Sequence, residues 1–94
     1  MVMDTIIKFE DKAIEFARLR GFTIVRYITT ENGKEIYQYT SPELLHKKLG
    51  LPLIIAIDRN GEIVEINDVE LLMRYRSILS KKLVSQGNNT IGTI

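Results

Sequence analysis

The chain has 94 residues, which is enough for one domain with a modest hydrophobic core. Its 13 Lys and Arg against 12 Asp and Glu give a net charge of +1, which argues against strong non-specific binding to polyanions but allows a local basic patch. The absence of cysteine excludes disulfides, thiol nucleophiles and thiolate metal sites.

The first part of the chain predicts a strand, a helix and a second strand. Residues 5–9 form a short β-favouring run. Between Glu10 and Arg20, apolar side chains recur at helical spacing among charged ones, and Gly21 can end the resulting helix. Residues 22–29 are rich in β-branched and aromatic side chains and predict the next strand.

A turn and a short helix are predicted in the middle of the chain. Asn32 followed by Gly33 is a strong hairpin signal, after which residues 35–39 return as a strand or as an extended arm. Tyr37 and Tyr39 share one face of that segment, which is either core or an exposed adhesive surface. Residues 41–43, Ser-Pro-Glu, are typical of a helix start, and residue 50 is a glycine that can end this helix.

The second half predicts a hairpin followed by a long amphipathic helix. Residues 53–57 are continuously apolar, as expected for a strand covered on both faces, and residues 58–61 supply a turn before an alternating run over 62–66. Asn67 followed by Glu70 resembles a helix cap, and an apolar stripe then continues to Leu83. We expect one domain over residues 1–84 and a flexible tail over 85–94.

This order of elements predicts an α/β fold. Helices between strands imply at least one parallel strand pair, whereas the turn at residues 58–61 requires an antiparallel edge. The expected architecture is a small mixed sheet of four or five strands with helices on both faces.

The same order and several local motifs resemble the thioredoxin-like fold in its compact, glutaredoxin-like form. Residues 50–55, GLPLII, look like the segment that enters a core strand through a cis proline, and residues 58–64, DRNGEIV, look like the hairpin that follows. The resemblance covers roughly residues 4–83. It implies a cis peptide bond between Leu51 and Pro52.

The chain departs from that family at the positions where its chemistry resides. Redox members carry a cysteine-containing loop between the first strand and first helix, but here Phe9 runs directly into Glu10 and Asp11. Glutaredoxins also place a glycine pair before the last helix, where this chain has Glu65 and Ile66. We therefore expect no thiol chemistry, no catalytic residue, no cofactor and no glutathione binding.

Other ionisable residues offer weaker signals. His46 is the single histidine, so no soft metal site can be completed around it, and a position on the solvent face of the short helix explains it. Glu10, Asp11 and Glu15 suit a helix start without any catalytic role. Asp4 and Lys8 interrupt the first apolar run, so no secretory signal is predicted; the longest apolar run, residues 51–57, is only strand-sized. A cytoplasmic protein without membrane contact is expected.

The favoured hypothesis is a non-catalytic, thioredoxin-like binding or adaptor protein that acts on another protein or on a second copy of itself. The resemblance places Pro52, with Leu51 before it, at the centre of the recognition surface. The neighbouring candidates are Phe9, Glu10, Asp11, Glu65, Ile66 and Asn67. As another possibility, the hairpin and the Tyr37 and Tyr39 stretch pair edge to edge in a homodimer.

Two alternatives use other residues. A regulator bound to nucleic acid would use Arg18, Arg20 and Arg26 together with the basic residues of the last helix, namely Arg74, Arg76, Lys81 and Lys82. An enzyme built on carboxylates is the second alternative, although no serine-histidine-acid set, histidine pair or glycine-rich phosphate loop supports it.

Overall fold

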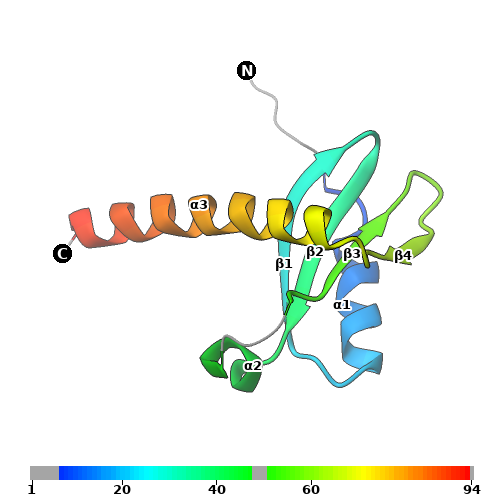
Figure 1. Cartoon of the computed structure of the whole chain (residues 1–94), viewed down its shortest axis with the longest axis horizontal. Coiled ribbons are helices and arrows are strands. Elements are labelled where there is room, and N and C mark those ends of the chain that lie inside the picture. Colours follow the sequence, from blue (N-terminus) through cyan, green and yellow to red (C-terminus); the bar gives the residue numbers. More distant parts are fainter. Residues whose placement is uncertain (1–6, 48–50, 94) are drawn as a thin grey trace.

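The structure, a computed structural model, describes residues 7–47 and 51–93. Its elements follow one another in the order α1 (Glu10–Leu19), β1 (Ile24–Glu31), β2 (Lys34–Thr40), α2 (Pro42–Lys47), β3 (Ile54–Ile57), β4 (Ile63–Glu65) and α3 (Val69–Thr93), as Figure 1 shows. The predicted α/β character of this small, cysteine-free domain is confirmed.

The four described strands form a sheet of order β1-β2-β3-β4, and each strand is antiparallel to its neighbour. The prediction of a mixed sheet with a parallel pair is therefore wrong for these strands. A parallel connection needs a crossover of a dozen or more residues over the face of the sheet. The six-residue helix α2 instead lies beyond the end of β2 (Figure 1), so the chain turns back and β3 runs beside β2 in the opposite direction.

The strand expected over residues 5–9 is not formed by its described part. Residues 5 and 6 lie outside the described residues, and residues 7–9 belong to no strand. The amides of Lys8 and Phe9 donate instead to the carboxylate of Glu35, at 2.8 and 3.0 Å. A side chain from β2 therefore satisfies the backbone groups that a neighbouring strand would otherwise bind.

The peptide bond between Leu51 and Pro52 is trans, because no cis bond occurs among the described residues. The expected cis proline is therefore wrong. Beyond it, the carbonyl of Leu53 accepts a 3.0 Å hydrogen bond from the amide of Tyr39, so the chain is already pairing with β2 as it leaves the proline. Neither the cis proline nor the parallel strand pair implied by the thioredoxin-like resemblance is present in the described residues.

The two hairpin turns are where the sequence placed them. Asn32 and Gly33 have φ values of 53° and 77°, both in the left-handed region, as a two-residue type I′ turn between β1 and β2 requires. In the second turn, the Asp58 carboxylate accepts 2.9 Å hydrogen bonds from the amides of Asn60 and Glu62. Local turn chemistry thus fixes the ends of both hairpins.

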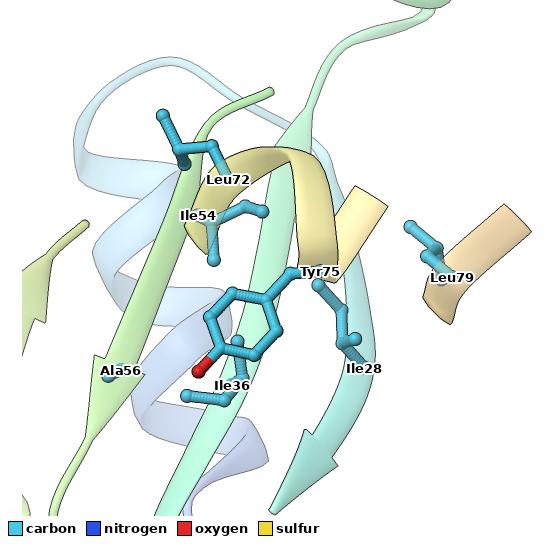
Figure 2. Close-up of a cluster of buried hydrophobic side chains, with 7 residues drawn as sticks. All are labelled: Ile28, Ile36, Ile54, Ala56, Leu72, Tyr75 and Leu79. Atoms are coloured by element: carbon cyan, nitrogen blue, oxygen red, sulfur yellow. The ribbon is translucent and has the colours of Figure 1, made fainter. Parts of the chain in front are cut away.

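Helices cover both faces of the sheet, as predicted, and each face has its own core. Against α1, the buried cluster contains Ala13, Ala17, Tyr37, Tyr39, Ile55 and Ile57. Against α3 it contains Ile28, Ile36, Ile54, Ala56, Leu72, Tyr75 and Leu79, with the Tyr75 ring extending from α3 over Ile36 (Figure 2). Every residue of β3 is buried, which confirms the strand expected to be covered on both faces.

Tyr37 and Tyr39 belong to the core rather than to an adhesive surface. They lie on the α1 face of β2, which is hydrogen-bonded on one side to β1 and on the other to β3. Edge-to-edge pairing of this stretch with a second copy, one of the options raised above, is wrong because β2 has no free edge.

The last helix begins later and continues further than the sequence pattern predicted. The Asp68 carboxylate accepts hydrogen bonds from the amides of Glu70 and Leu71, at 2.9 and 3.3 Å, so Asp68 rather than Asn67 is the N-terminal cap. Leu72, Tyr75 and Leu79 pack on the sheet, and the helix continues to Thr93, through residues 85–93 of the expected tail. This distal part projects past β1 in Figure 1.

Candidate functional site

A cleft of about 390 Å³ lies on the α3 face of the sheet, between the tip of the β1–β2 hairpin and the first turns of α3. Its apolar lining comes from Ile36, Ala56, Val64, Ile66 and Leu71. Its polar lining comes from the hairpin and from the chain around the start of α3, including Glu31, Lys34, Asn67, Asp68, Arg74 and Tyr75. The cleft therefore combines an apolar lining with charged groups.

One wall of the cleft is an ion pair that ties the hairpin tip to α3. The Arg74 guanidinium donates to both carboxylate oxygens of Glu31, with 3.0 Å between Nη1 and Oε1, and the Tyr75 hydroxyl donates to Oε1 at 3.0 Å. The hydrogen bond and charge of Glu31 raise the pKa of Arg74. Burial, then the Glu31 carboxylate, raises the pKa of Tyr75. The three side chains thus form a fixed, charged wall.

Two large exposed apolar side chains lie beside this wall. Among the described residues, Val64 on β4 is 60% exposed and Leu71 on α3 is 36% exposed, and both line the cleft. Val69 and Met73 are also exposed, but helical spacing places them on the other flank of α3 from Leu71, and they do not line the cleft. Val64 and Leu71 are therefore the large exposed apolar side chains that a partner in the cleft would contact.

The carboxylates that line the cleft already have partners. Glu31 binds Arg74 and Tyr75, and Asp68 caps α3. Glu65 pairs across the strands with Ile55 of the α1-side core, and its carboxylate lies on that side, 3.5 Å from the Arg20 guanidinium. Within the described residues, no group of three or more His, Cys, Asp and Glu side chains is placed to hold a metal ion. A molecule bound in the cleft would therefore contact apolar side chains and charged groups that are already paired with one another.

The predicted site residues do not form one surface. Glu65, Ile66 and Asn67 line the cleft. Leu51, 48% exposed, and Pro52 do not line it and precede β3 at the end of the sheet where Leu53 pairs with Tyr39.

Phe9, Glu10 and Asp11 lie at the opposite end. Phe9 is hydrogen-bonded to Glu35, which pairs with Ile57 at the far end of β3. Since β3 separates the two groups, the surface predicted around Pro52 is divided.

The residues that sequence reasoning missed include Val64 and Leu71 in the apolar lining and Glu31, Arg74 and Tyr75 in the wall. Val64 stands on the wetter face of an alternating strand, which is a weak signal that could have been noticed. No local pattern joins Glu31 to Arg74, because 43 positions separate them. They meet only because α3 packs against the sheet beside the tip of the β1–β2 hairpin.

The arginines proposed for nucleic-acid binding are divided in the same way. Arg18 binds both carboxylate oxygens of Glu15, at 2.8 and 2.7 Å, and this hydrogen bond and charge raise its pKa. Arg20 pairs with Glu65, and its guanidinium lies 3.6 Å from the Phe16 ring centroid. Arg26 pairs in register with Gln38, on the face of β2 that also carries Ile36 and α3. The set does not converge on one basic patch.

No family model, curated protein or solved structure matches this chain. None of the described helices, the 25-residue α3 included, carries an apolar stretch that would cross a bilayer. The fold and the cleft are therefore the observations from which a function is argued.

Proposed function

We propose that the protein is a non-catalytic binding protein that acts through protein–protein interaction, and that its partner docks on the cleft between the β1–β2 hairpin and α3. The observation that carries this proposal is that two large apolar side chains, Val64 and Leu71, are exposed where they line the cleft.

The chemistry of the cleft suits such a partner. Protein interfaces combine an apolar centre with a polar rim, and here Val64 and Leu71 provide the centre while Lys34 and the Glu31–Arg74 pair provide the rim. The lining carboxylates serve the ion pairs and the helix cap described above, which supports a binding role over an acid–base one.

The test begins with a photoreactive amino acid at Asn67, an exposed residue of the cleft, in cells that produce the protein. Mass spectrometry of the crosslinked product identifies the partner, whose affinity is then measured for the wild type and for Val64→Asp and Leu71→Asp. Each substitution places a charge in the apolar centre and should weaken binding roughly tenfold or more.

Leu19→Asp is the matched control. Leu19 is 69% exposed on α1, on the other face of the sheet, so the same change there should leave the affinity as it is. A partner that binds all three variants as tightly as the wild type would contradict docking at the cleft.

A further inference from the structure

Strand β1 leaves an open edge in the described sheet. It is eight residues long and pairs only with β2, whereas β4 at the other edge has three residues. The unpaired N–H and C=O groups of a long edge strand are a template for pairing with another chain. The edge of β1 is therefore the place in this sheet where unwanted association is most readily expected.

Two features interrupt that edge at the same point. The register of β1 against β2 shifts between Tyr27 and Thr29, which marks Ile28 as a bulged position. The Lys82 ammonium, from α3, donates a 2.6 Å hydrogen bond to the Ile28 carbonyl and lies 4.8 Å from the Tyr27 ring centroid. A positive charge is thus held in the middle of the open edge by a residue 54 positions further along the chain.

We propose that Lys82 prevents β1 from pairing with β1 of a second copy of this chain. The second copy is the expected partner because β1 matches itself in length, while the three-residue β4 cannot cover an eight-residue edge. An approaching strand would need the space that the Lys82 side chain occupies, and it would desolvate the ammonium and displace it from Ile28.

Lys82→Met tests this directly, because methionine keeps an unbranched apolar side chain but loses the charge and the donor. Sedimentation equilibrium should show wild-type chains as 10.8 kDa monomers. The variant should form a dimer of twice that mass, with a self-association constant roughly tenfold higher or more. This increase is expected because the charge-assisted hydrogen bond that holds Lys82 over the β1 edge no longer has to be broken. Lys82→Arg, which restores charge and donor, should return the monomer.

Lys81→Met is the matched control, since Lys81 is an exposed neighbour without a hydrogen bond to β1 within the described residues. Far-UV circular dichroism establishes that each variant folds. If Lys82→Met does not fold, Lys82→Ser provides a second replacement at this exposed helical position.

The chain has no cysteine, so a single nitroxide label at Arg26→Cys reports where association occurs. Dipolar coupling between labels should appear in the Lys82→Met background and be absent with Lys82 intact. A monomeric Lys82 variant, dimers whose labels do not couple, or a wild type that already pairs through β1 would each overturn the proposal. None of these outcomes depends on the cleft, so this proposal fails or stands separately from the proposed function.

Discussion

The Tyr37 hydroxyl donates a 2.7 Å hydrogen bond to the Glu35 carboxylate, and both side chains are buried on the α1 face of β2. The same carboxylate accepts the amides of Lys8 and Phe9 just before α1 begins. Phe9, the residue at the helix start, makes no capping bond with its own side chain. Glu35 therefore supplies from the sheet the anionic acceptor that a local cap would otherwise provide.

Tyr37→Phe should destabilise the protein by about 2 kcal/mol, because it removes one hydrogen bond to a buried charged group. For a domain of this size the melting temperature should fall by roughly 10 °C. Tyr39→Phe is the control, since Tyr39 is buried on the same face and no hydrogen bond of its hydroxyl is found within the described residues. Equal losses for the two variants, measured by thermal unfolding, would show that the Glu35 contact contributes nothing specific.

The same cluster predicts how stability depends on pH. Burial by itself would raise the pKa of Glu35, but hydrogen bonds from the Lys8 amide, the Tyr37 hydroxyl and the Phe9 amide, with the charge of Lys8, lower it below its ordinary value of 4.5. The unfolded chain therefore takes up the proton more readily. The contribution of Glu35 is fully present above pH 4.5 and is lost as the pH falls through the folded-state pKa.

Urea unfolding of the wild type and of Glu35→Gln between pH 7 and pH 3 checks this sign. The wild type should be more stable at pH 7, and the difference in unfolding free energy should shrink as the pH falls. Glu62→Gln, the same change at an exposed glutamate, is the matched control for the substitution itself. A difference between wild type and Glu35→Gln that stays constant over this range would contradict the linkage.

The parts of the fold that were predictable are those that local chemistry decides. Asn32 and Gly33 supply the left-handed conformations of a two-residue turn, and the alternation of charged and apolar residues specifies which side of α1 is buried. The cap of α3 was missed by one residue because Asn67 and Asp68 are both good caps, and the carboxylate of Asp68 makes the bonds.

The parts that failed depend on contacts between distant segments. A β-favouring run before α1 was assigned to the sheet, but residues 7–9 are held by the side chain of Glu35 and not by a strand. The helix predicted from residue 41 was expected to cross a face of the sheet, but α2 lies beyond the end of the sheet. The local sequence of a short helix does not distinguish these two placements. Three of the thirteen residues that line the cleft, Glu65, Ile66 and Asn67, are among the predicted site residues, whereas its wall joins Glu31 to Arg74 across 43 positions.

Two adjacent leucines on α3 should differ sharply in their contribution to stability. Leu72 is 4% exposed in the core against the sheet, so Leu72→Ala should cost about 2–5 kcal/mol through lost burial and the cavity left behind. Leu71 is 36% exposed in the cleft, so Leu71→Ala should cost roughly 1 kcal/mol or less.

Denaturant unfolding measures both values. If Leu71→Ala were as damaging as Leu72→Ala, Leu71 would be needed for packing, and the proposal that it is available to a partner would lose its basis. Because both substitutions have the same helix propensity change, the comparison isolates burial.

Nucleic-acid binding and docking of a protein at the cleft predict opposite results in a mobility-shift assay. Glu15 and Glu65 pair with Arg18 and Arg20, and the chain has a net charge of only +1, so labelled DNA or RNA should not be retained at low salt in a mobility-shift assay. The double variant Glu15→Gln and Glu65→Gln frees both arginines and removes two negative charges, which raises the net charge from +1 to +3. Weak retention that disappears as salt is raised should then emerge in the variant alone. Salt-sensitive retention by the wild type that Arg26→Ala reduces would instead favour a basic patch. It would contradict the view that Arg18 and Arg20 serve only in ion pairs with Glu15 and Glu65.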